Sequence, residues 1–123
     1  MGAKADAMVA ALRAFGLTFP GAHSKAPWPE HDDLAVNDKI FAHLPTAGAD
    51  RFTLSVKLPY TGPAALDLPF ATPTAYGLGR SGWVSFGPAD DEIPALHQLK
   101  EWVEESYRAR APRRLVKELD ARG

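Results

Sequence analysis

The sequence predicts an α+β protein in which a single antiparallel β-sheet packs against N- and C-terminal helices. Near both ends of the chain, apolar residues recur at three- and four-residue spacing, which is typical of amphipathic helices. Between the ends the apolar period becomes two, and ten of the eleven prolines fall from Pro20 to Pro94, which disfavours long helices there. A chain of 123 residues with 46% hydrophobic side chains suits one domain over residues 1–123.

The first expected element is a helix over residues 4–15. Its apolar stripe consists of Met8, Leu12 and Phe15. Gly16 and the proline four residues later are expected to stop this helix.

The middle of the chain is expected to supply the strands of the sheet. Asn37-Asp38 is a favourable two-residue turn between two apolar runs, which predicts a hairpin. Phe52 to Leu58 alternates apolar and polar residues, as in a strand buried on one face only. In chain order, the expected elements are strands at 34–36, 40–44 and 52–58, a short helix at 64–68, and a strand at 83–86.

A second long helix is expected over residues 94–107. Three acidic residues precede it and two arginines follow it, so the charges complement the helix dipole at both ends. A short final helix is expected after Pro112, from Leu115, Val116 and Leu119.

Composition excludes several kinds of chemistry. The chain has no cysteine, which removes thiol nucleophiles, cysteine-bound zinc and disulfides. No apolar run approaches the ~20 residues of a membrane span, and the start lacks a signal pattern, so we expect a cytoplasmic protein. Fourteen basic and fifteen acidic side chains give a net charge of −1, so no strong overall field attracts nucleic acid.

Four histidines are the first residues to test for metal binding. Glu30-His31-Asp32-Asp33 holds four potential ligands, but neighbouring side chains rarely converge on one ion, and no two histidines have the i,i+4 helical spacing of a zinc hydrolase. A solvated loop is the favoured interpretation, and a weak metal or regulatory site is the alternative. His43 and His97 are expected at ordinary surface or boundary positions. We expect no metal and no cofactor.

Two motifs for catalysis or cofactor binding fail on spacing or context. Gly79-Arg80-Ser81-Gly82 is one residue short of a nucleophile elbow. Residues 77–82 fit Gly-x-Gly-x-x-Gly, but a strand follows the glycines where a dinucleotide site requires a helix. The carboxylate pairs at 90–91 and 104–105 suit a helix N-terminus and an exposed helix face. We therefore expect a protein that is not an enzyme.

The charge distribution is more informative than the total charge. Residues 90–105 hold six acids and one lysine, whereas residues 106–117 hold five basic side chains and no acid. Such a segment either contacts several phosphates or forms a solvated tail that complements a helix dipole. Lys57 and Arg80 extend the basic segment if they share its face.

The three tryptophans are large enough to define a core or a recognition surface. Trp102 is expected in the core, whereas Trp28 and Trp83 are expected to be partly exposed.

Two segments resemble the MmcQ/YjbR family of small bacterial proteins. They are residues 76–84, Tyr-Gly-Leu-Gly-Arg-Ser-Gly-Trp-Val, and residues 102–108, Trp-Val-Glu-Glu-Ser-Tyr-Arg. Earlier segments at 19–22, 27–28, 37–42 and 54–58 occur in the order that the family shows, so the resemblance runs from about Ala5 to Leu119.

The resemblance implies a CyaY/YjbR-like fold related to the frataxin sandwich, and DNA binding through a double-wing motif. No enzymatic activity or cofactor comes with it. The sequence departs from the family pattern at Asn37-Asp38, where Gly-Gly is common, and at Pro29-Glu30-His31 before the first strand. The second change leads us to expect Glu30, Asp32 and Asp33 beside a wing, where they would repel phosphate.

Two functions of different classes follow. The first is DNA binding, non-specific or regulatory, with phosphate contacts from Lys57, Arg80, Arg108, Arg110, Arg113 and Arg114. The second is a non-enzymatic protein- or small-ligand-binding module, whose surface would be formed by Tyr76, Arg80 and Trp83.

Overall fold

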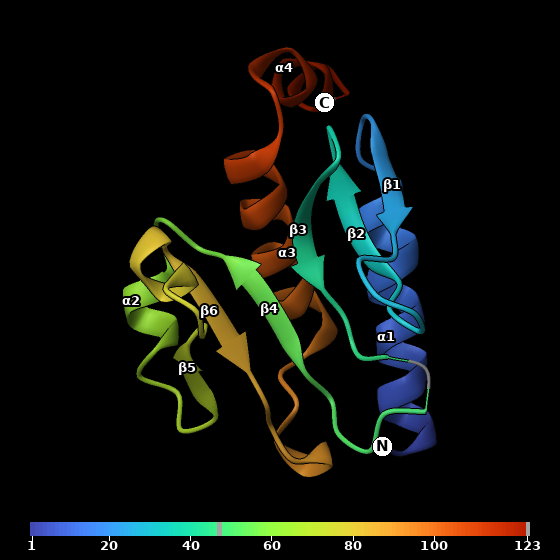
Figure 1. The fold of residues 1–123 in the computed structure, drawn as a ribbon, viewed down its shortest axis with the longest axis vertical. Helices are drawn as coiled ribbons and strands as arrows, with labels where there is room; N and C mark the ends of the chain where they lie inside the picture. Colours follow the sequence, from blue (N-terminus) through green and yellow to red (C-terminus); the bar gives the residue numbers. More distant parts are fainter. Residues whose placement is uncertain (47, 123) are drawn as a thin grey trace.

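The computed structural model, which describes residues 1–46 and 48–122, confirms the α+β class. Six strands form one antiparallel sheet in the order β1-β2-β3-β4-β6-β5, and α1 and α3 lie on the same face of it (Figure 1). The strands are β1 (Ala22–Lys25), β2 (Asp33–Val36), β3 (Lys39–His43), β4 (Leu54–Lys57), β5 (Ala71–Pro73) and β6 (Trp83–Phe86). The helices are α1 (Ala3–Leu17), α2 (Gly62–Ala65), η1 (Leu78–Ser81), η2 (Asp90–Glu92), α3 (Leu96–Arg110) and α4 (Arg113–Ala121).

The N-terminal helix is present, but the expectation that Gly16 stops it is wrong. The helix continues through Gly16 to Leu17. Gly16 is buried, and a β-carbon there would overlap with the side chain of Leu34 on β2. This glycine therefore allows α1 to approach the sheet closely. The chain leaves the helix at Thr18, whose hydroxyl donates to the Phe15 carbonyl.

The predicted hairpin is confirmed, with Asn37 and Asp38 at φ 51° and 62°, the left-handed values that a type I′ turn requires. The register between β2 and β3 shifts beyond this turn. Leu34 lies opposite Ala42 and Ala35 opposite Ile40, so Phe41 is the extra residue of a β-bulge.

Two strands that the sequence analysis did not predict form the edges of the sheet. β1 reads Ala-His-Ser-Lys and has no apolar alternation, while β5 has three residues and ends in Pro73. A proline is tolerated there because an edge strand leaves one row of N–H groups without strand partners. Both strands are defined by pairing with β2 and β6 rather than by a local apolar pattern.

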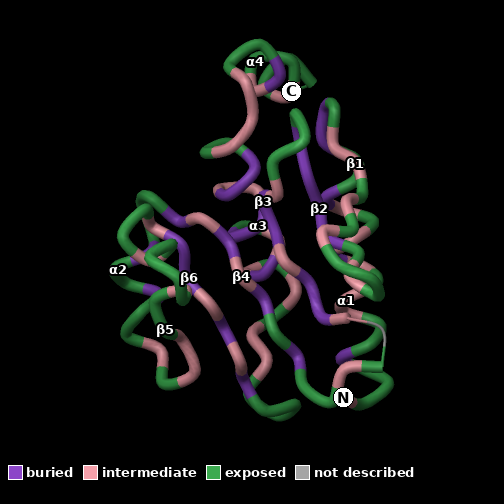
Figure 2. Tube along the Cα trace, viewed as in Figure 1, coloured by how far each residue is buried: buried purple, intermediate pink, exposed green. Residues whose placement is uncertain are grey.

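The core lies between the sheet and the two long helices, where buried segments of α1, α3 and the central strands face one another (Figure 2). Trp102 is buried as expected, and its indole stacks on the Phe86 ring of β6, with the centroids 4.2 Å apart. Tyr107 is completely buried, and its hydroxyl donates to the Pro20 carbonyl over 2.6 Å. No helix in the described part of the chain is both long and apolar enough to cross a membrane.

The C-terminal helices have slightly different bounds from those expected. α3 begins at Leu96, so Pro94 precedes the helix, and the three acidic residues before it form the separate turn η2. The expectation that residues 104–105 form only an exposed face is wrong for Glu105. Its carboxylate accepts hydrogen bonds from the backbone N–H groups of Tyr60 and Thr61 and from the Thr61 hydroxyl.

Candidate nucleic-acid interface

We call the side of the sheet away from α1 and α3 the open face. Phe86 and its partner Leu54 point toward α3, because Phe86 stacks on a tryptophan of that helix. Side chains alternate along a strand, so the neighbouring cross-strand pairs Ser55–Ser85 and Lys57–Trp83 point to the open face. The open face therefore combines hydroxyl groups, a lysine and a tryptophan.

The last turns of α3 bring an arginine to this face. The Ser106 hydroxyl donates to the Phe41 carbonyl of β3 and accepts from the Lys57 N–H of β4. The serine thus bridges two backbone groups on neighbouring strands. One turn later, Nε of Arg110 donates to the Ile40 carbonyl, and the guanidinium lies 5.7 Å from the centre of the Trp83 ring. Arg110 and Lys57 therefore both lie near Trp83.

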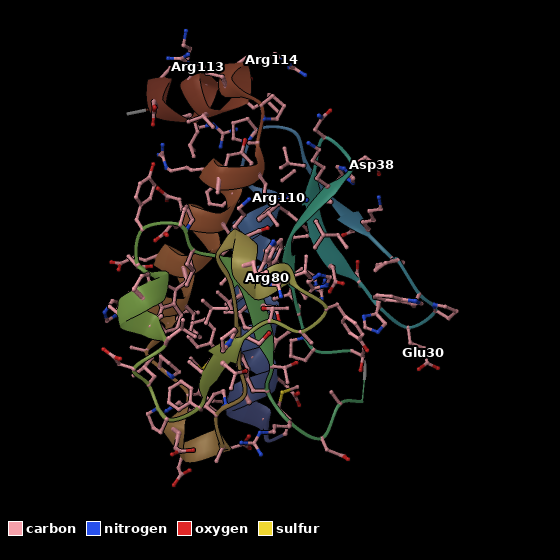
Figure 3. All side chains as sticks on the ribbon, turned by 60° about the vertical axis from the view of Figure 1, so that its left-hand side comes forward. Glu30, Asp38, Arg80, Arg110, Arg113 and Arg114 are labelled. Carbon is pink, nitrogen blue, oxygen red and sulfur yellow. The ribbon has the colours of Figure 1, made fainter. Side chains whose placement is uncertain are left out.

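The other predicted basic residues have different surroundings. Arg113 and Arg114 begin α4 and are exposed, and Figure 3 shows them pointing away from the body of the protein. Arg80 is exposed on η1 and, together with Trp83, lines a hollow of about 220 Å³. Lys57 is half-buried. The structure thus distributes these cations over the open face and the adjoining end of the molecule.

Arg108 is set apart from this group by its two carboxylate partners. Its guanidinium lies 2.8 Å from the Asp120 carboxylate and 3.0 Å from that of Glu104. The hydrogen bond to Asp120 is the main reason that the pKa of Arg108 is raised, although burial opposes the shift. Its charge is already compensated within the protein, so Arg108 is the least suited of the six predicted residues to contact phosphate.

The expectation that Trp83 is partly exposed is wrong, because only 5% of it is accessible. Its ring lies 5.8 Å from that of His43 and packs beneath Arg110, which closes the surface on which a ligand would stack. Tyr76, by contrast, is fully exposed. The surface proposed for a binding module therefore lacks its central aromatic element. Trp28 is 60% exposed, in agreement with the prediction.

The acidic residues also differ from the prediction. Asp33 does not lie in a solvated loop, because it is completely buried at the start of β2. One carboxylate oxygen accepts from the Leu44 N–H and the other bonds Nδ1 of His43, each over 2.9 Å. His43 is therefore held by a buried acid, a contact between two strands that local sequence does not reveal.

The remaining acids of this region mostly have cationic partners. Asp32 forms an ion pair with Arg13 at 3.2 Å, and Asp38 forms one with Lys25 at 3.1 Å. Glu30 is exposed on the loop before β2, and Figure 3 shows it away from the four labelled arginines. Within residues 1–46 and 48–122, no three histidine or acidic side chains are arranged to hold a metal ion.

Comparison with protein families matches this chain to the YjbR family over residues 17–109, about three quarters of its length. The chain belongs to the YjbR family. The YjbR match includes the whole sheet, η1 and nearly all of α3, and therefore Lys57, Arg80 and Arg108. Arg110 and helix α4 lie beyond it. A search of curated proteins finds no match.

Proposed function

We propose that this YjbR-family protein binds DNA weakly and without sequence preference, as a binding function with no catalytic step. The contacts would be made to phosphates by five cationic residues, Lys57, Arg80, Arg110, Arg113 and Arg114. One observation supports this most directly: none of the five forms an ion pair with a carboxylate of the described residues. Their charges therefore remain available for phosphate.

The arrangement favours contacts to phosphate over reading of bases. The five cations come from β4, η1, α3 and α4, and neither long helix presents a row of polar side chains on the open face. Phosphate contacts fix position without conveying sequence. With a net charge of −1, dissociation constants in the range of about 10⁻⁴ to 10⁻⁶ M at physiological salt are expected, as for non-specific binding generally.

The test is fluorescence anisotropy of a labelled random duplex, titrated with protein at about 50 and 200 mM salt. Arg113→Glu/Arg114→Glu is compared with Lys4→Glu/Lys100→Glu, which reverses two charges on α1 and α3 instead. Both variants change the net charge equally, so the comparison separates local contacts from the overall field.

The proposal predicts that duplex binding weakens as the salt concentration rises. In Arg113→Glu/Arg114→Glu the duplex affinity should fall by about tenfold or more, and the salt dependence should decrease by the equivalent of about two phosphate contacts. The lysine variant should stay within about twofold of the wild type. Absence of binding by folded protein at low salt would overturn the proposal. Equal losses in the two variants would overturn the assignment to this surface.

A further inference from the structure

Two exposed aromatic side chains border the open face. Trp28 lies on the loop between β1 and β2, and Tyr76 lies on the loop between β5 and η1. Most of the large apolar side chains are buried, as in globular proteins generally. The core does not include these two rings, and the phosphate contacts proposed above do not involve them.

Trp28 is connected to the open face by a short series of contacts. Its indole packs edge-on against the His31 ring, with the centroids 5.1 Å apart. Nδ1 of His31 lies 3.8 Å from the Asp33 carboxylate. Asp33 points to the open face because its neighbour Leu34 packs against α1 on the other side of the sheet. Trp28 is therefore anchored at the β1–β2 side of this face.

Tyr76 occupies the corresponding position at the β5–β6 side. Two residues before it, the Thr74 hydroxyl bonds Ser85 on the open face over 2.8 Å. Backbone bonds from Leu78 to Ala75 and from Gly79 to Thr74 hold the turn that presents the tyrosine. Tyr76 adopts φ 60°, a left-handed conformation uncommon for an aromatic residue. The loop thus holds a fully exposed ring in a defined turn.

The charges of the open face suit a polyanion. Arg80 lies on η1, directly after the loop that holds Tyr76, and Arg110 and Lys57 lie near Trp83 on the open face. Of the nearby acids, Asp33 is enclosed, and Asp32 and Asp38 have cationic partners. Among these acids only Glu30 is both exposed and without an ion pair in the described part of the chain.

We infer that the open face binds single-stranded DNA, with unpaired bases stacked on Trp28 and Tyr76 and phosphates near Arg80 and Arg110. The inference rests on the proposed function and specifies its ligand. A duplex offers phosphates but hides the faces of its bases, whereas a single strand offers both. Exposed aromatic rings beside cations are the combination by which proteins bind single strands without reading sequence.

The experiment compares a labelled thymidine oligonucleotide of about 15 nucleotides with a duplex of the same length and with an abasic strand, all at low salt. The variants are Trp28→Ala and Tyr76→Ala. Tyr60→Ala is the matched control, because Tyr60 is 86% exposed but lines a groove with Phe15 and Lys100 of α1 and α3. Each exposed side chain is removed without disturbing the core, and circular dichroism confirms folding.

The thymidine strand is expected to bind more tightly than the duplex or the abasic strand. Each of the two alanine variants should weaken its binding by about fivefold or more, with duplex binding unchanged and Tyr60→Ala equal to wild type. Trp28→Phe and Tyr76→Phe should retain most of the affinity, because a phenyl ring still stacks.

Three results separate failure of this inference from failure of the proposed function. Salt-dependent duplex binding with no preference for the thymidine strand would overturn the inference and leave the proposed function standing. Equal losses in Tyr60→Ala and the two loop variants would also overturn it. If the folded protein binds none of the three nucleic acids, both the inference and the proposed function are overturned.

Discussion

The Ser106 side chain makes two contacts whose removal should have a measurable cost. Its hydroxyl is completely buried and bridges β3 and β4 by donating to the Phe41 carbonyl and accepting from the Lys57 N–H. Ser106→Ala removes both contacts and introduces no bulk. The pairing of β3 with β4 ends at Ala42, opposite Val56, so the Phe41 carbonyl depends on this serine in place of a partner on β4.

The size of the effect follows from the two backbone groups left without a partner. A buried donor or acceptor left unsatisfied costs about 1–3 kcal/mol. Alanine has a higher helix propensity than serine, which returns about 0.5 kcal/mol in α3. The free energy of unfolding should therefore fall by about 1.5–5.5 kcal/mol, a large part of the ~5–15 kcal/mol of a typical domain.

Urea unfolding followed by circular dichroism measures this difference. Ser81→Ala is the control, because Ser81 is exposed on η1, and its free energy of unfolding should stay within about 0.5 kcal/mol of wild type. In Ser106→Ala and wild type the free energy of unfolding should decrease with urea concentration at the same slope, so that the shift in midpoint reports stability. A Ser106→Ala protein as stable as the Ser81→Ala control would refute the bridging role.

Four further predictions concern three other residues. Tyr107→Phe should lower the free energy of unfolding by about 1–3 kcal/mol in urea, because the buried Pro20 carbonyl loses its donor. Burial raises the pKa of Tyr107, so this tyrosine ionises at a lower pH in the unfolded chain than in the folded protein, and stability falls above pH ~10. A calorimetric pH series should show a smaller fall in Tyr107→Phe. Arg108→Gln should change duplex affinity by about twofold or less in anisotropy, since Glu104 and Asp120 already hold that guanidinium. Gly16→Val should cost about 1–3 kcal/mol in thermal unfolding because its side chain collides with Leu34; stability equal to wild type would contradict the close packing of α1.

The elements that the sequence predicts are those whose signals are local. The stripe at Met8, Leu12 and Phe15 and the turn at Asn37-Asp38 are each contained within a few residues. The edge strands β1 and β5 have no comparable pattern, because pairing with β2 and β6 defines them. Gly16 illustrates the same limit, since glycine suggests a helix end and only the position of Leu34 shows that it serves packing.

The candidate site depends even more on contacts between distant segments of the chain. Residue type and charge predicted the basic residues, but not which of them have partners. Arg108 and Asp120 are twelve positions apart and meet only because α4 folds back toward α3. Arg110 reaches Trp83 from the end of α3, and His43 lies beside the same ring from β3. Such contacts between distant segments decide which charges and rings remain available, and no local pattern encodes them.

The most direct test of nucleic-acid binding by the open face is a map of amide chemical-shift changes in isotope-labelled protein, titrated with the thymidine oligonucleotide. Binding at the open face should shift the amide signals of Trp28, Tyr76 and Arg80 and of the start of α4, and leave the groove around Tyr60 unaffected. Changes confined to that groove, or none at all with folded protein at low salt, would show that the open face does not bind the strand.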